Sequence, residues 1–448
     1  MIVCGLGFGD EGKGAIVDAV VRRSGARAVV RFNGGPQAGH NVVTDDGRWH
    51  CFAQLGAGSF AGAETWLASG MLVELEALTV EAEVFAAKAS AARVTIDPEC
   101  TLVTPMHKLV GQLRELSAPR GSCGMGVGEA VQWRERGVFV RAGDVSVAGL
   151  ERLRTQAFTL AEPLATTEEG RAVVAYFRER CDPRALFARY REVLAGVCIA
   201  GVGGAIAAAP GPVVFEGAQG ALLDRTRGFV PHVTPSRTTA DAANAPGPFR
   251  LGVLRAYGHR HGAGPFPTED VTLSAPLADI YNVENRWQGA FRLGWLDLVM
   301  LRYGLTLSPV GALAVTGLDR LRGFSELRLC SAYVYEGDLA VLEGLVTFEG
   351  LGPGRARVTA IHVPGDLDRA RALTRILFAC RPLEWLVVPG FTEAIGAVRR
   401  LSDLPANARR YLDEIERALA TPVAIVSVGP TGGAKIVTAN APRSLFGP

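Results

Sequence analysis

The segment spanning residues 7–14 reads GFGDEGKG and places two carboxylates and one lysine among four glycines. When such a loop joins a strand to a helix, its glycines let backbone N–H groups approach phosphate oxygens, and the lysine adds positive charge. The spacing therefore predicts a phosphate-binding loop (P-loop) in which Lys13 contacts the phosphates of a nucleotide. An ordinary strand-to-helix turn is the alternative interpretation.

Two features of this loop depart from the usual P-loop pattern. Gly14 replaces the Ser or Thr that would hold Mg²⁺, and Asp10 and Glu11 stand where phosphates are expected to bind. A carboxylate beside a phosphate is repelled unless a metal bridges the two groups or the carboxylate acts as a base. Asp10 is the better candidate for both roles.

A second glycine-rich segment, NGGPQAGH, covers residues 33–40 and ends in a histidine. An imidazole can hydrogen-bond a phosphoryl group during its transfer, so His40 is a candidate catalytic residue. A structural role for this histidine carries equal weight as an interpretation. Further along the chain, Glu216, Gln219 and Thr234 follow apolar segments, at positions where α/β proteins bind ligands.

Short apolar segments that lead into glycine-rich turns must position these residues. Buried apolar strands that alternate with helices indicate an α/β fold with a large, mostly parallel central sheet. Residues about 145–200 show helical periodicity and are expected to form a helical insertion in a single catalytic unit spanning residues 1–448. The predicted strands are Ile2–Gly5, Ala28–Phe32, Val213–Phe215, Leu251–Ala256, Leu313–Val315 and Ala424–Val426, and the predicted first helix is Ala15–Arg23.

The composition excludes several classes of protein. The 448 residues are 48% hydrophobic, which excludes a disordered chain, and 47 Lys+Arg against 45 Asp+Glu give a net charge of only +2. That charge balance predicts no nucleic-acid or membrane partner. The eight cysteines show no metal-ligand spacing and are expected to be reduced thiols in a cytoplasmic protein.

Seven motifs together resemble those of the adenylosuccinate synthetase family, in the family's order and over nearly the whole chain. They are GDEGKG at 9–14, GGPQAGH at 34–40, FEGAQGALLD at 215–224, GAGPFPTE at 262–269, LGWLD at 293–297, VTGLDRLRGF at 315–324 and SVGP at 427–430. The resemblance implies a homodimeric, Mg²⁺-dependent ligase of purine biosynthesis. Such a ligase uses GTP to join IMP to L-aspartate through a 6-phosphoryl-IMP intermediate.

The resemblance also implies roles for individual residues. Asp10 would be the general base and a Mg²⁺ ligand, the carbonyl of Gly39 a second ligand, and His40 the group that stabilises the phosphoryl group in transfer. Asp319 would pair with guanine and so select GTP. The implied GTP-binding positions are Gly9, Glu11, Gly12, Lys13, Gly14, Asp319, Ser427 and Gly429, and the implied IMP-binding positions are Gln37, Cys123, Arg136, Gln219 and Thr234.

Some of these positions differ in residue type from the family. Gln37 stands where the family has asparagine, and Cys123 where it has threonine, although a thiol is a weaker hydrogen-bonding group than a hydroxyl. The arginine that reaches across the dimer to the partner's IMP is either Arg134 or Arg136, and the alignment favours Arg136.

The largest difference lies in the loop that holds aspartate in the family, where two arginines grip the carboxylates. Gly289 and Phe291 replace them, and Trp287 replaces a threonine. Removing one partner of a buried charge pair costs about 3–5 kcal/mol, so the usual mode of aspartate binding is weakened. Arg286 and Arg292 flank the loop and offer replacements.

These residues leave four hypotheses. The first is an adenylosuccinate synthetase with a rearranged acceptor loop, and the second is a paralogue that activates a purine nucleotide with GTP but accepts a different amine or nucleotide. In the second, Trp287 and Phe291 would line a less acidic pocket. A non-catalytic GTP-binding protein is opposed by the retention of Asp10, Lys13 and His40, and a plain P-loop kinase is opposed by Gly14.

Overall fold

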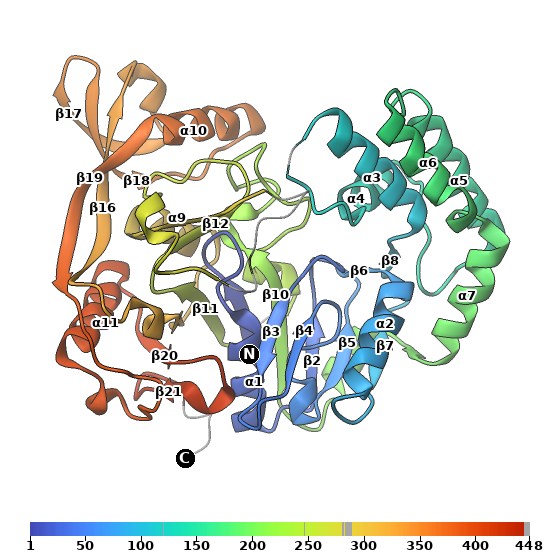
Figure 1. Cartoon of the computed structure of the whole chain (residues 1–448), viewed down its shortest axis with the longest axis horizontal. Coiled ribbons are helices and arrows are strands. Elements are labelled where there is room, and N and C mark those ends of the chain that lie inside the picture. Colours follow the sequence, from blue (N-terminus) through green and yellow to red (C-terminus); the bar gives the residue numbers. More distant parts are fainter. Residues whose placement is uncertain (120, 246, 280–281, 283–288, 443–448) are drawn as a thin grey trace.

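The central sheet is the element that brings the candidate residues together. The computed structural model describes residues 1–119, 121–245, 247–279, 282 and 289–442. Within them, ten strands form one sheet in the order β21-β20-β15-β11-β1-β10-β2-β5-β7-β9, parallel except for the β20–β21 pair (Figure 1). The strands are β1 (Ile2–Gly5), β2 (Ala28–Arg31), β5 (Glu64–Leu67), β7 (Val94–Ile96), β9 (Cys198–Ile199), β10 (Val213–Gly220), β11 (Arg250–Arg255), β15 (Ala312–Thr316), β20 (Val423–Ser427) and β21 (Lys435–Val437).

The predicted α/β fold and all six predicted strands are confirmed. In β1, Val3 packs into one hydrophobic cluster while Ile2 and Cys4 pack into another. Because successive side chains of a strand point to opposite faces, both faces of the sheet are covered at this point. This explains why the strands are continuous apolar runs rather than alternating ones.

Helix α1 (Lys13–Ser24) begins where the P-loop ends. Gly12 and Gly25 flank it with φ angles of 84° and 62°, a left-handed conformation that glycine adopts without steric cost. Its apolar residues Ile16, Val17 and Val20 are buried against the sheet. The helix dipole therefore points its positive end into the loop.

The helical region is larger than predicted. Helices α5 (Val147–Ala161), α6 (Glu168–Arg180) and α7 (Pro183–Ala195) fill the expected stretch, and α3 (Pro105–Ser117) and α4 (Val127–Glu135) precede them. Figure 1 shows α3–α7 gathered at one end of the molecule. Helix α2 (Leu75–Ala86) contacts α7 and lies between this region and the central sheet.

A second sheet, not predicted from the sequence, lies at the opposite end of the molecule (Figure 1). It pairs β14 (Leu296–Asp297), β16 (Glu326–Glu336), β17 (Val346–Gly352), β18 (Arg355–Ile361) and β19 (Cys380–Pro389), and α9 (Leu298–Leu307), α10 (Leu367–Ala379) and α11 (Ala406–Leu419) contact it. The remaining elements are α8 (Val202–Ala207) and three strand pairs, β3 (His40–Val43) with β4 (Trp49–Phe52), β6 (Leu72–Val73) with β8 (Thr101–Leu102), and β12 (Gly258–His261) with β13 (Phe291–Gly294).

None of the helices in the described residues is both long enough and apolar enough to cross a membrane.

Candidate active site

A cavity of about 700 Å³ opens at the carboxyl ends of the central strands. The P-loop follows β1, the loop with His40 follows β2, Gln219 lies in β10, and Arg255 ends β11. Ligands of open α/β sheets bind at this edge. The sequence-predicted residues that line the cavity are Gly9, Asp10, Gly12, Lys13, Gly14, Gln37, Gly39, His40, Cys123, Gln219 and Thr234.

The two carboxylates of the P-loop have different surroundings. Asp10 lines the cavity, with a left-handed backbone at φ 58°. Glu11 is fully buried inside the loop, where its carboxylate accepts hydrogen bonds from the N–H groups of Gly7 (3.0 Å) and Gly9 (2.9 Å). The same carboxylate pairs with Nζ of Lys13 at 2.6 Å. Although burial opposes the charge, the Lys13 ammonium holds the pKa of Glu11 below its ordinary value.

Close packing explains why glycine stands at position 14. A Cβ atom at Gly14 would lie 2.8 Å from Cβ of His40 and 3.0 Å from the His40 carbonyl carbon. The start of β3 therefore occupies the space that a Ser or Thr side chain would need. Glycine at position 14, in place of the usual Ser or Thr, therefore allows His40 to pack against the P-loop.

Glu216 orients His40. Nδ1 of His40 lies 2.5 Å from Oε1 of Glu216, and the other oxygen of Glu216 accepts the Ala57 N–H at 3.0 Å. Burial lowers the pKa of His40, which favours the neutral imidazole. Burial disfavours the charge of Glu216, but Arg31 and His40 outweigh it and lower the pKa of this carboxyl. Nδ1 of His40 is therefore the donor, and its Nε2 is left for other partners.

Two amide side chains in the cavity wall have unsatisfied oxygens. Gln219, with φ 64°, donates from Nε2 to Oγ1 of Thr234 at 2.7 Å, while its Oε1 is buried and has no hydrogen-bond partner among the described residues. Oε1 of Gln37 is also buried and unpartnered. Buried polar atoms normally have partners, and backbone strain is often stored at functional sites. Both oxygens are therefore placed to accept hydrogen bonds from a ligand.

The two sequence-predicted residues from the α3–α4 region lie in different places. Cys123 lines the cavity, and burial raises the pKa of its thiol, which is therefore protonated at neutral pH. Arg136 caps the C-terminus of α4, is exposed, and does not line the cavity of its own chain.

The oxygen donors suit a magnesium ion. Asp10 and Gly39 both line the cavity, and Mg²⁺ binds one or two protein oxygens together with the phosphate oxygens of a nucleotide. The described residues contain no cluster of three or more His, Cys, Asp or Glu side chains that would hold a metal by themselves. The donor set thus fits a metal that arrives with its nucleotide.

The residues expected to bind guanine follow or end strands β15 and β20, which both lie on the β11 side of β1 in the sheet. Asp319 follows β15, and Ser427 ends β20, its neighbour in the sheet. Nζ of Lys435 donates to the Gly429 carbonyl at 2.7 Å, and the Ser427 hydroxyl donates to the same carbonyl at 3.0 Å. Burial raises the pKa of Asp319.

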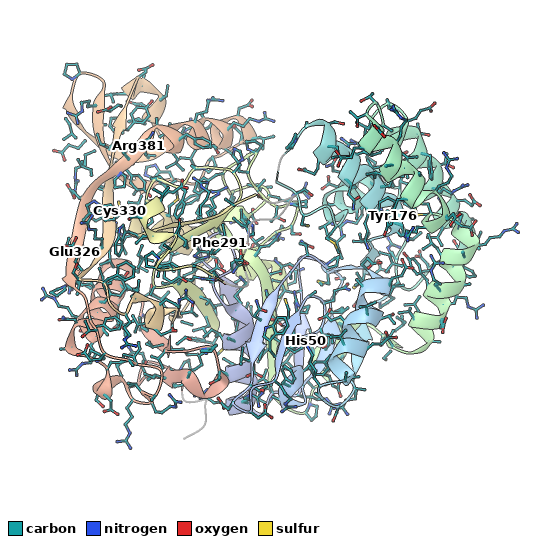
Figure 2. The ribbon with its side chains drawn as sticks, in the orientation of Figure 1. His50, Tyr176, Phe291, Glu326, Cys330 and Arg381 are labelled. Atoms are coloured by element: carbon teal, nitrogen blue, oxygen red, sulfur yellow. The ribbon has the colours of Figure 1, made fainter. Side chains whose placement is uncertain are left out.

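Arg292 is held by other groups in the acceptor region. Its guanidinium pairs with Glu269 and donates to the carbonyls of Gly262 (3.2 Å) and Gly264 (2.9 Å). Phe291 does not line the cavity but packs behind it, with ring centroids 5.6 Å from His261 and 6.0 Å from His259. Figure 2 shows Phe291 near the middle of the molecule. Trp287 and Arg286 lie outside the described residues.

All five cationic side chains that line the described part of the cavity already have partners. Lys13 pairs with Glu11, Arg114 with Glu129, Arg225 with Glu135 and Arg255 with Asp279, while Arg260 donates to three backbone carbonyls. A ligand carboxylate or phosphate must therefore exchange partners with the protein.

Sequence reasoning gave no role to three residues of the site. The sequence marks Glu216 only as a polar residue at a strand end, and no sequence pattern marks Arg255 or His259. Nε of Arg255 donates to the Asp10 carbonyl at 2.6 Å, and Nε2 of His259 hydrogen-bonds the Gly9 carbonyl. Their partners are 245 and 250 residues away in sequence, so no local pattern signals them.

Comparisons with known proteins identify the family of the chain. The profile of the adenylosuccinate synthetase family matches residues 2–351 and 359–436. Adenylosuccinate synthetases from Acidithiobacillus ferrooxidans (33% identical, 96% of each chain covered) and Alkalilimnicola ehrlichii (32%, 98% of each) are similar to the chain. The fully ligated adenylosuccinate synthetase from Plasmodium falciparum has the same fold, with a TM-score of 0.77, 23% identity and coverage of 98% of this chain and 99% of that one. The chain therefore belongs to the adenylosuccinate synthetase family, ligases that join IMP to L-aspartate with GTP in purine biosynthesis.

Proposed function

We propose that the cavity activates the 6-oxo group of IMP by phosphorylation from GTP and then replaces the phosphate with the amine of L-aspartate. The observation that carries this proposal is the convergence of three groups in one cavity. These are Asp10 and Lys13 in the P-loop, His40 held by Glu216, and the unsatisfied amide oxygens of Gln37 and Gln219.

The proposed chemistry assigns one task to each side chain. Asp10 takes the lactam proton as the purine oxygen attacks the γ-phosphorus of GTP, which releases GDP. His40 donates from Nε2 to the phosphoryl oxygens, a role that requires protonation of that nitrogen and that the Glu216 carboxylate favours. Lys13 leaves Glu11 to neutralise phosphate charge. The aspartate amine then attacks C6, and the oxygen departs with the phosphate.

A magnesium ion bound between Asp10, the Gly39 carbonyl and the nucleotide would neutralise charge on the phosphates.

Three further assignments belong to this proposal. Asp319 accepts the guanine N–H groups beside Ser427 and Gly429, which selects GTP over ATP. Arg136, exposed at the end of α4, reaches the site of a second copy in a homodimer. The eight free cysteines suit the cytoplasm, where thiols remain reduced.

The proposal retains aspartate as the amine. The relatives compared above are named adenylosuccinate synthetases, so a different amine is not favoured. The altered loop instead predicts weak aspartate binding, because Gly289 and Phe291 supply no charge and Arg292 is paired with Glu269.

The test follows GDP release and the mass of the purine product with GTP, Mg²⁺ and IMP, with and without L-aspartate. Product that depends on all four components supports the proposal. Turnover with IMP and another amine, but never with aspartate, overturns the choice of amine. Absence of GDP in every mixture overturns the whole proposal.

A further inference from the structure

Three successive carbonyls of the P-loop each accept a hydrogen bond from a side chain of a different strand, which acts as a cap. The Gly9 carbonyl accepts from Nε2 of His259 in β12, and the Asp10 carbonyl accepts from Nε of Arg255 in β11 at 2.6 Å. The Glu11 carbonyl accepts from the Thr316 hydroxyl in β15 at 2.5 Å.

These caps fix the direction of the N–H groups that a phosphate needs. In a planar trans peptide, the N–H of the next residue points opposite to the carbonyl. Holding the carbonyls of Gly9, Asp10 and Glu11 toward the capping side chains therefore turns the following N–H groups away from those side chains. The left-handed backbones of Gly9 (φ 85°) and Asp10 (φ 58°) lie in this stretch, so the caps hold a conformation that is costly for the Asp10 residue.

Among the described residues, the His259 side chain hydrogen-bonds only the loop, at the Gly9 carbonyl. Arg255 also donates to Tyr257 and Asp279, and Thr316 also donates to the Leu254 carbonyl. The His259 side chain is 6% exposed, and burial together with the charge of Arg255 lowers its pKa, so the ring is neutral. A neutral ring facing a carbonyl carries its proton on Nε2, and within the described part of the chain Nδ1 has no hydrogen-bond partner.

The same ring contacts the wall of the acceptor region. Phe291 packs against His259 with ring centroids 6.0 Å apart, and the Arg255 guanidinium lies 5.6 Å from the Phe291 ring. Across the β12–β13 ladder, Phe291 stands opposite His261, which lines the cavity. Two of the three caps therefore belong to one packed cluster with Phe291, the residue that replaces a family arginine.

We propose that His259 is a positioning residue for phosphoryl transfer, holding the Gly9 carbonyl so that the P-loop keeps its phosphate-binding shape and stays joined to the Phe291 side of the cavity. The kinetic part of this inference rests on the proposed function, whereas the structural part does not.

The test compares His259→Leu, which removes the donor, with His259→Gln, which carries an amide N–H at about the position of Nε2. His259→Phe is a second donor-free variant that keeps a ring against Phe291. His50→Leu is the matched control, because His50 is equally buried (3% exposed) but packs on Phe52 and Phe85 outside the cavity. Figure 2 shows His50 well apart from Phe291.

The first readout is hydrogen–deuterium exchange of the ligand-free protein in the peptide that covers residues 5–14. Losing one hydrogen bond should speed exchange there by about fivefold in the Leu and Phe variants and not in the Gln or His50 variants. Unchanged exchange in the Leu and Phe variants, or equal acceleration in His50→Leu, overturns the inference, whatever the enzyme does.

The second readout separates kcat from the KM for each substrate. Misplacing the loop should lower kcat about tenfold or more in the Leu and Phe variants, with the KM for GTP within about threefold of the parent and recovery in the Gln variant. A fully active Leu variant overturns the inference while leaving the proposed function intact. A parent protein that never releases GDP overturns the proposed function and leaves the exchange result to decide the structural part.

Discussion

The chemistry of the site is set by the separate surroundings of a few polar side chains. Adjacent carboxylates in one loop would repel a phosphate, but the fold buries Glu11 against two backbone N–H groups and Lys13 and leaves Asp10 at the cavity. Glu216 similarly fixes which nitrogen of His40 faces the carboxylate. A loop with two carboxylates thereby supplies one structural anion and one candidate base.

The first prediction concerns Asp10. Asp10→Asn keeps the size of the side chain but cannot take the lactam proton, so turnover should fall by about 10³-fold or more. The Kd for a non-hydrolysable GTP analogue, measured by calorimetry, should change by less than about tenfold. Near-normal turnover in this variant would contradict the base assignment.

The second prediction concerns the carboxylate behind His40. Glu216→Gln leaves Arg31 buried without its anionic partner and removes the charge that favours a protonated His40. We expect kcat to fall by about 30-fold and the free energy of unfolding to fall by about 3 kcal/mol. Steady-state kinetics and urea denaturation measure the two effects. A loss of stability with kcat unchanged would show that Glu216 has only a structural role.

Several site residues were predictable from sequence because their signals are local. The spacing of Asp10 and Lys13, and the glycines before His40, identify loops that the sheet then brings together. Glu216, Arg255 and His259 were not predictable, because each acts on a residue about 175–250 positions away. The reason for Gly14 was equally hidden, since it depends on how closely β3 approaches α1.

At the scale of elements, the pair of strands β12 and β13 shapes the acceptor side of the cavity. Arg292 in β13 is held by Glu269 and two carbonyls, which removes it as a free partner for a substrate carboxylate. Phe291 faces the opposite way along the strand and packs on His259 and His261. This arrangement is the structural reason why we predict weak aspartate binding.

The third prediction returns a charge to this strand. Phe291→Arg should lower the KM for aspartate about tenfold, because an arginine is longer than phenylalanine and can extend past the cavity wall to offer a substrate carboxylate a charge-assisted hydrogen bond. The new guanidinium would lie near Arg255, so the ligand-free variant should be less stable and should recover with aspartate. Gly289 is a poorer site for the graft, since its φ of 73° strains any other residue. Kinetics with Phe291→Leu as the uncharged control provide the test, and equal KM values in the two variants would contradict the prediction.

The fourth prediction concerns Asp297, which caps α9 and joins it to the second sheet. Its carboxylate accepts from the Met300 N–H at 3.0 Å and the Tyr333 hydroxyl at 2.6 Å, and burial raises its pKa to about 6. The folded state therefore holds this proton more tightly than the unfolded state does. The Asp297 carboxyl therefore adds about 3 kcal/mol to the free energy of unfolding below about pH 4. This contribution is lost as the pH rises to about 6.

Asp297→Asn removes this titration. The free energy of unfolding of the parent minus that of the variant, measured with urea from pH 4 to pH 7, should therefore decrease as the pH rises. A constant difference across that range would contradict the raised pKa of Asp297.

At the scale of the whole molecule, one sheet gathers the site and two regions flank it. The parallel strands were predictable because both faces are buried, which makes each strand an apolar run beside a glycine turn. The second sheet was not, because β17 exposes most of its residues and β19 exposes apolar side chains, including Leu383, Leu386 and Val387. Neither strand shows the alternation that would reveal it.

The fifth prediction tests the proposed homodimer. Asp10→Asn and Arg136→Ala should each be nearly inactive alone. If each site takes Arg136 from the partner, mixing equal amounts after reversible dissociation should restore about a quarter of parental activity, since half the dimers are mixed and each has one intact site. Light scattering should give twice the chain mass. A mixture no more active than its parts would contradict the shared site.

The central step of the proposed reaction is transfer of the γ-phosphoryl group of GTP to the 6-oxygen of IMP in this cavity. The most direct measurement supplies IMP labelled with ¹⁸O at that oxygen, together with GTP, Mg²⁺ and L-aspartate, and records the mass of the inorganic phosphate. We predict that each phosphate released carries one ¹⁸O atom and that this labelled phosphate is lost in Asp10→Asn. Phosphate that carries no label, with GDP still formed, would mean that water attacks GTP and would contradict phosphoryl transfer to IMP.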